Sequence, residues 1–335
     1  MEILEKNQDL LSFLQEGIPI VKEPFKKIAE DLDIPQNDVI EAIKKLKEEK
    51  IIRQISPIYD TKSLGYESSL VAFKTDRIEE TANFINEHPG VSHNYERTDD
   101  FNLWFTIAVP PDSKLGLEET VKKIAEITKV KDYVILKTEK LFKIGVKLNF
   151  KDTKEKEDFF PENKEKKAVN LSKFDKEIIK ITQKDIPLKE RPFKVYADIL
   201  GISEEDLIEK LRFYLQSGIM RRFAAILYHR KAGFKANGMT VWKVPENLVE
   251  RVGYKIASYR AVSHCYKRTT NEKWKYNQFA MVHAQSKEEI EELVEEISKE
   301  TGIKEYKILY STREFKKRRI NYFSEDFYRW EEKYS

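Results

Sequence analysis

The chain has 335 residues, and its 61 Lys and Arg nearly balance 58 Asp and Glu, for a formal net charge of +3. That length predicts about two to three domains, and the small net charge argues against a protein that coats nucleic acid. No stretch is apolar enough for a membrane span and the acidic N-terminus lacks signal-peptide features, so we expect a soluble, cytoplasmic protein. A lone Cys265 excludes an intrachain disulfide and a cysteine-ligated iron–sulfur cluster.

The chain begins with a pattern of short helices and continues with strands. Apolar residues spaced i, i+3, i+4 recur through 10–14, 25–32 and 39–46, and this spacing predicts a helix-turn-helix unit. Strands are then predicted over 51–59, 68–75, 93–97, 103–109 and 133–146. Further helices are predicted over 77–87 and 117–128. From residue 68 onward the order is βαββαβ, which is typical of a ferredoxin-like domain.

The whole pattern occurs twice. The segment that starts at Pro24 aligns without gaps with the one that starts at Pro192, and VSHNYER at 91–97 matches VSHCYKR at 262–268. We therefore predict an α+β fold of two repeats, each a helix-turn-helix domain followed by a ferredoxin-like domain, paired as an intramolecular pseudo-dimer. A further homodimer is left open. The predicted domains are the first helix-turn-helix at 1–55, the first ferredoxin-like domain at 56–150, a charged linker at 151–170, the second helix-turn-helix at 171–223 and the second ferredoxin-like domain at 224–335.

This architecture resembles the Lrp/AsnC family of transcription regulators, which bind DNA through the first domain and amino acids through the second. A recognition helix needs cations or amides toward the phosphates. Here both second helices begin with carboxylates, which repel phosphate. They cannot release counterions from DNA, which is the main contribution to affinity for DNA. We therefore do not expect this chain to bind nucleic acid. The acidic residues are Asp38, Glu41, Glu204, Glu205, Asp206 and Glu209.

Candidate catalytic residues come from a repeated HxYxR motif on a predicted strand. Side chains two residues apart point to the same face of a strand. An imidazole, a phenol and a guanidinium in one space can protonate a substrate atom and hold a carboxylate beside it. The predicted catalytic residues are His93, Tyr95 and Arg97 in the first copy and His264, Tyr266 and Arg268 in the second.

Candidate binding residues gather in the second half, where cations alternate with aromatics over 220–231. Such a mixture predicts a concave site for a flat, polyanionic ligand. The first-half counterpart keeps Arg53 but few other charges, and the similar run at 313–323 fits a solvated surface equally well. The predicted substrate-binding residues are Arg221, Arg222, Tyr228, His229, Arg230, Lys231, Trp242 and Asn277.

Longer motifs resemble the siroheme decarboxylase family: VSHNYERTDDFNLWFTI with KTEKLFKIGV, and RRFAAILYHRK with VSHCYKR and LYSTREFKKRRINYF. The resemblance spans nearly the whole chain outside the linker and implies a natural fusion of two subunit types. It also implies removal of the C12 and C18 acetate carboxyls of siroheme, giving 12,18-didecarboxysiroheme and CO2 in haem or haem d1 biosynthesis. Because the macrocycle itself can accept electrons, we expect no protein-bound cofactor. A tetrapyrrole-responsive Lrp/AsnC-type regulator is the alternative.

The resemblance also implies roles for the candidate residues. We expect His264 to act as a general acid, with Tyr266 positioning it, while Arg268 and either Arg221 or Arg222 orient carboxylates. The main site is then on the second half, and the first triplet is a second site or a wall. No protein-bound metal is expected, although His264 or His93 could instead ligate the siroheme iron. For His88 we predict a structural role.

Overall fold

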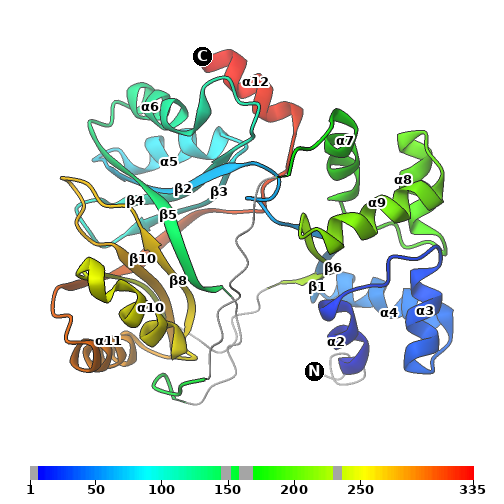
Figure 1. The fold of residues 1–335 in the computed structure, drawn as a ribbon, viewed down its shortest axis with the longest axis horizontal. Helices are drawn as coiled ribbons and strands as arrows, with labels where there is room; N and C mark the ends of the chain where they lie inside the picture. Colours follow the sequence, from blue (N-terminus) through cyan, green and yellow to red (C-terminus); the bar gives the residue numbers. More distant parts are fainter. Residues whose placement is uncertain (1–6, 145–151, 158–168, 229–235) are drawn as a thin grey trace.

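The computed structural model describes residues 7–144, 152–157, 169–228 and 236–335. Two lobes lie side by side in Figure 1, a lobe of strands covered by helices and a lobe made mainly of helices. Within the described ranges, no helix is long and apolar enough to cross a membrane. Both halves of the sequence contribute to both lobes.

The helical lobe contains the two predicted helix-turn-helix units. The first unit consists of α2 (Gln8–Glu16), α3 (Pro24–Leu32) and α4 (Gln36–Glu48). The second consists of α7 (Lys173–Thr182), α8 (Pro192–Leu200) and α9 (Glu204–Gln216). Proline stands in the first turn of α3 and of α8, where its fixed φ suits a helix start. Both units are as predicted.

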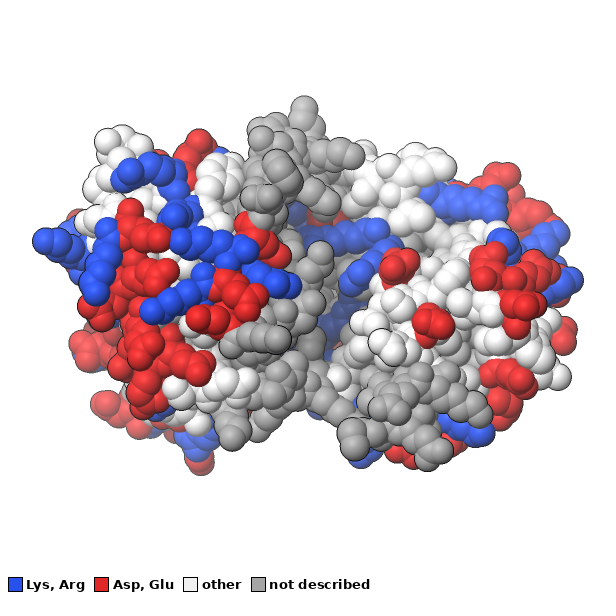
Figure 2. Space-filling view, turned by 90° about the horizontal axis from the view of Figure 1, so that it is seen from below, with Lys and Arg blue, Asp and Glu red and all other residues white. Residues whose placement is uncertain are grey.

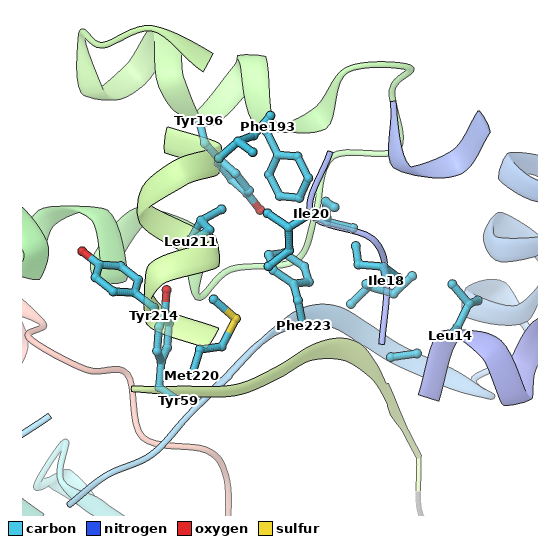
Figure 3. Packing of buried hydrophobic residues seen from close by; sticks show 14 of the residues in the cluster. Leu14, Ile18, Ile20, Tyr59, Phe193, Tyr196, Leu211, Tyr214, Met220 and Phe223 are labelled. Carbon is cyan, nitrogen blue, oxygen red and sulfur yellow. The ribbon is translucent and has the colours of Figure 1, made fainter. Parts of the chain in front are cut away.

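One apolar core joins the two helix-turn-helix units. In Figure 3, Ile18 of the first half lies between Leu14 and Phe223, and Phe223 packs beside Phe193 of the second half, with Leu211 in the same core cluster. Phe193 and Leu211 have no exposed surface. Because neither unit closes its core alone, the helical lobe depends on both halves of the chain.

A two-stranded ribbon runs along this core. It consists of β1 (Ile52–Tyr59) and β6 (Met220–Leu227), which pair antiparallel with Ile55 opposite Ala225. Most of the buried apolar side chains of both strands, among them Ile55 and Phe223, belong to the helical core. The domain boundaries predicted at 55/56 and 223/224 therefore fall inside strands, because β1 and β6 pack with the helices that precede them.

The other lobe is a closed antiparallel barrel. The first half supplies β2 (Glu67–Lys74), β3 (Val91–Arg97), β4 (Leu103–Val109) and β5 (Asp132–Ile144). The second half supplies β7 (Ala236–Trp242), β8 (Val262–Arg268), β9 (Gln278–Ala284) and β10 (Tyr306–Lys317). The order around the barrel is β10-β3-β4-β2-β5-β8-β9-β7. Each half keeps the ferredoxin-like strand order, and the last strand of each half pairs with the HxYxR strand of the other.

Helices cover the outside of the barrel, and apolar side chains fill its inside. The covering helices are α5 (Ile78–Glu87), α6 (Gly116–Thr128), α10 (Val249–Ser258) and α11 (Lys287–Thr301), with a short 3₁₀ turn η1 (Glu246–Leu248) before α10. Leu70, Trp104, Leu136 and Phe279 belong to a cluster contributed by strands of both halves. Each sheet is thus buried on both faces.

A C-terminal helix, α12 (Glu325–Tyr334), was not predicted. It packs against the first half, where Phe327 and Trp330 join the core beneath α5 and α6. The ring of the fully buried His88 lies 4.4 Å from the ring of Trp330, and its Nδ1 accepts a hydrogen bond from Gly90 N at 3.0 Å. His88 is therefore structural, as predicted. The spacing of Phe327, Trp330 and Tyr334 along the sequence is the signal for this helix.

Candidate active site

Each HxYxR triplet forms a ladder of side chains on one face of its strand. The rings of His264 and Tyr266 are 6.2 Å apart and nearly parallel, and Cζ of Arg268 lies 4.7 Å from the Tyr266 ring centre. In the first half His93 and Tyr95 are also 6.2 Å apart, with Arg97 over Tyr95 at 5.4 Å. The predicted shared face is confirmed.

The imidazole and the guanidinium of one ladder do not meet. A strand rises about 3.3 Å per residue, so residues four positions apart are about 13 Å apart along it. The imidazole and the guanidinium of one triplet therefore do not contact the same carboxylate, and the predicted role of the arginine in orienting a carboxylate stays a prediction. Period two places side chains on one face but does not make them converge.

Arg97 is buried and Arg268 is half-buried. Nη1 of Arg97 donates to Leu309 O at 3.2 Å, and Nη1 of Arg268 donates to Thr138 Oγ1 at 2.8 Å and Leu136 O at 3.2 Å. Burial lowers the pKa of each guanidinium to about 10. Among the described residues neither arginine forms an ion pair. Both therefore anchor the tyrosine of their ladder from inside the barrel.

The imidazole ends of the two ladders influence each other. Burial lowers the pKa of His264 to about 4, and positive charge on His283, His93 and Arg268 contributes. The pKa of His93 is also lowered, first by burial and then by Lys317. Nδ1 of His264 is bonded to Ser263 Oγ at 2.8 Å, whereas Nε2 has no hydrogen bond to any described residue. Nε2 is thus the nitrogen available to a substrate.

Further arginines lie on the ribbon and on the segment after β10. Arg318 N donates to Ser92 O at 2.8 Å, which fixes this segment beside the first ladder. Burial lowers the pKa of Arg319, and the charges of Arg53 and Arg222 lower it further, so Arg319 lies within electrostatic reach of both. Within the described part of the chain, none of the three is ion-paired. Figure 2 shows a hollow between the two lobes with Lys and Arg side chains on its walls.

Arg221 is held differently from Arg222. Its Nε and Nη2 donate to Oδ2 of the buried Asp60 at 2.9 and 2.7 Å. The positive charge of Arg221 still acts on the Tyr266 phenol, whose pKa is raised by burial and partly lowered again by Arg268 and Arg221. Arg221 is therefore a fixed charge between the ribbon and the second ladder.

Other predicted contacts have mixed outcomes. Tyr228 follows β6 and is 46% exposed, whereas His229, Arg230 and Lys231 lie outside the described residues. Trp242 was predicted wrongly: it has no exposed surface and packs under α10 and α11. Both faces of this sheet are apolar, so sequence period alone could not tell which way the ring points.

The prediction that Asn277 binds the substrate is also corrected. Its amide donates to Val244 O at 2.8 Å and accepts from Val244 N at 2.9 Å, which holds the chain after β7. Sequence reasoning in turn missed Arg319, which belongs to the basic run at 313–323. The alternation of cations and aromatics in that run could have indicated Arg319 as a binding residue.

The surroundings of the two ladders differ. The Tyr95 hydroxyl donates to Glu314 Oε2 at 3.1 Å, and Glu314 lies opposite Tyr95 on β10. The residue opposite Tyr266 on β5 is Leu141, which is 43% exposed. A carboxylate beside the first ladder repels an anionic ligand, whereas the second ladder has an apolar neighbour there.

Comparison with known proteins supports this architecture. Residues 63–143 and 231–316 match the AsnC-like ligand binding domain, and residues 7–53 and 175–221 match the siroheme decarboxylase NirDL-like HTH domain. A siroheme decarboxylase of Hydrogenobacter thermophilus is 52% identical over 323 residues, which cover 96% of each chain. The siroheme decarboxylase beta subunit of Methanosarcina barkeri is 42% identical over 147 residues, 44% of this chain and 97% of that subunit.

A solved structure agrees over the full length. The crystal structure of the siroheme decarboxylase NirDL in co-complex with an iron-uroporphyrin III analogue matches with a TM-score of 0.81 at 46% identity, covering 97% of each chain. The fold and the cationic hollow define a fused pair of AsnC-like units with a site for an anionic ligand. The chain belongs to the siroheme decarboxylase family, in the form that joins two subunit types in one polypeptide.

Proposed function

We propose that this chain decarboxylates siroheme in the hollow between its lobes, removing the C12 and C18 acetate carboxyls to give 12,18-didecarboxysiroheme and CO2. The observation that carries the proposal is that the positive charges of Arg53 and Arg222 both act on Arg319, while none of the three forms an ion pair among the described residues. Adjacent cations repel one another unless an anion binds between them, and a macrocycle edged with carboxylates supplies such anions. The iron-uroporphyrin analogue bound to the related NirDL supports a ligand of this shape.

The reaction places a modest demand on the protein. The bond between the acetate methylene and its carboxylate breaks, CO2 leaves, and the electron pair stays on the methylene carbon, where the macrocycle can delocalise it. One proton then completes the methyl group. No electron is gained or lost overall, so we propose that no protein-bound cofactor takes part.

We assign the proton to Nε2 of His264. The pKa of this imidazole is held low by burial and by neighbouring cations, and bound carboxylates raise it toward its ordinary value. We assign the acid to the second ladder because Tyr266 has the apolar Leu141 as its neighbour. In the first ladder, the carboxylate of Glu314 accepts a hydrogen bond from the Tyr95 hydroxyl. His93, whose Nε2 has no hydrogen bond to a described residue, then forms a wall of the same hollow or contacts the siroheme iron.

Anaerobic incubation with siroheme, followed by mass spectrometry of the tetrapyrrole, tests the proposal. Loss of two CO2 units is expected. Recovery of unchanged siroheme from a saturated protein would contradict the enzyme and favour a tetrapyrrole sensor.

We further propose a cytoplasmic chain that does not bind DNA. Glu204, Glu205 and Asp206 form the first turn of α9, and Glu204 is buried in an ion pair with Arg191. These carboxylates repel phosphates where a recognition helix needs cations. The free, buried Cys265 is compatible with a reducing compartment. A gel shift at low salt should show no retention of DNA. Light scattering would establish whether the chain forms a further homodimer.

A further inference from the structure

One hydroxyl group joins two imidazoles behind the second ladder. Ser263 Oγ lies 2.8 Å from Nδ1 of His264 and 2.8 Å from Nε2 of His283. Ser263 is 1% exposed, on β8, and His283 is on the neighbouring strand β9. A hydroxyl has one hydrogen and two lone pairs, so Ser263 can donate to only one of the two rings while it accepts from the other.

The direction of these bonds determines what His264 can do. If Nε2–H of His283 donates to Ser263, then the Ser263 hydroxyl donates to Nδ1 of His264. The hydrogen of a neutral His264 is then on Nε2, the nitrogen without a described partner. In the opposite direction Nε2 carries only a lone pair and cannot donate. A second group that orients an imidazole selects its tautomer in this way.

We propose that His283 and Ser263 form a proton relay that serves His264, and this inference rests on the proposed decarboxylation. As Nε2–H of His264 passes to the substrate carbon, the Ser263 hydroxyl proton moves to Nδ1 and the Nε2 proton of His283 moves to Ser263. His283 changes from imidazolium to neutral imidazole, and exchange with water restores it after release of the product. One proton is consumed for each CO2 released, and no other reactant is needed.

The electrostatics of the site make such a relay useful. His264 is half-buried among positive charges, and its low pKa leaves it neutral before the substrate binds. A neutral imidazole that gives up its only proton becomes an unstable anion unless its other nitrogen is protonated at the same time. Ser263 and His283 supply that proton from the side of the ring bonded to Ser263.

The first half offers an internal comparison. Ser92 Oγ lies 2.9 Å from Nδ1 of His93, as Ser263 does from His264. The register of β3 with β4 places Ala108 where β9 has His283, since His93 pairs with Thr106 and His264 with Met281. The duplicated serine therefore has a second imidazole only in the half to which we assign the acid.

Three variants test the relay: His283→Gln, His283→Ala and Ser263→Ala. Glutamine can still donate a hydrogen bond to Ser263 but cannot release a proton. We expect His283→Gln to lower the single-turnover rate of CO2 loss by roughly 10- to 100-fold, with the affinity for siroheme unchanged in a Soret titration. Added imidazole should restore part of the rate of His283→Ala. Ser298→Ala is the control, because Ser298 lies on the outer helix α11 and donates to Ile303 O; this variant should keep the wild-type rate.

Nitrogen-15 NMR of the ring nitrogens gives a readout that needs no turnover. Wild-type His264 should carry its hydrogen on Nε2, and Ser263→Ala should mix the two tautomers. A wild-type protein that binds siroheme without releasing CO2 would overturn the decarboxylation while leaving the tautomer test valid. A His283→Gln variant as fast as wild type, or one that loses rate and affinity together, would overturn the relay.

Discussion

The two HxYxR ladders are copies with different neighbours. In both, an imidazole, a phenol and a guanidinium stack along a strand with nearly equal spacing. Glu314 binds the first phenol, whereas Leu141 lies opposite the second. Each of these neighbours comes from the last strand of the other half. Duplication therefore preserved the ladder, and the pairing between halves made the two copies chemically unequal.

The largest expected effect distinguishes the two histidines. Replacing His264 with alanine should reduce turnover by roughly 100- to 10,000-fold, because general acid catalysis is lost, while siroheme still binds. The His93→Ala variant should lose much less turnover, because we expect His93 to be a wall residue. Rates of CO2 loss followed by mass spectrometry, with Soret titrations for binding, measure both. Equal losses in the two variants would contradict the assignment of the acid to the second ladder.

The second effect concerns stability, where His88 of the first half corresponds to Tyr259 of the second. Burial lowers the pKa of His88 to about 3 from 6.5, so the unfolded chain takes up a proton below pH 6.5 that the folded chain refuses. The stabilisation is complete above pH 6.5 and is lost as the pH falls toward 3. By pH 4 the loss amounts to about 3 kcal/mol.

Urea unfolding of wild type and His88→Gln at pH 7 and pH 4 measures this loss. The variant should lose less stability than wild type between the two pH values. Tyr254→Phe on α10 is the control and should keep the wild-type pH dependence, because Tyr254 has no acidic partner among the described contacts. An unchanged pH dependence in His88→Gln would show that other groups cause the acid sensitivity.

A smaller effect is expected for the arginines on the ribbon. Arg222→Ala should weaken siroheme binding about tenfold, or about 1.4 kcal/mol, because one charge-assisted contact is lost. The rate of the bound complex should change little. Lys122→Ala on the outer helix α6 is the control and should bind siroheme as wild type does. A variant with unchanged affinity but slower chemistry would instead place Arg222 at the reacting acetate.

The smallest expected effect comes from exchanging the neighbours of the two phenols. Leu141→Glu places a carboxylate opposite Tyr266 and should weaken siroheme binding several-fold through repulsion. Glu314→Leu should leave binding equal or slightly tighter. Soret titrations at low and moderate salt measure both. Equal affinities in all three proteins would show that the ladders do not contact the charged edge of the macrocycle.

Much of the architecture could be predicted from local patterns. The helix-turn-helix units follow from i, i+3, i+4 spacing, and the shared face of His264 and Tyr266 follows from period two. Trp242 shows where such patterns stop, since a strand buried on both faces has no polar side that identifies the direction of its ring. The position of α12 against the first half was likewise missed, although its apolar spacing was visible.

By itself, the sequence determined the duplication, the element types and the residues of the two ladders, because these depend on neighbours along the chain. Only the tertiary structure decided which residues lie beside each ladder. Glu314 pairs with the first ladder and Leu141 with the second, each from the last strand of the other half. His283 contacts Ser263 behind the second ladder. Strand pairing between the two halves brings together residues far apart in sequence, and no local periodicity encodes that partner. The chemistry that separates the two halves is therefore a property of the closed barrel.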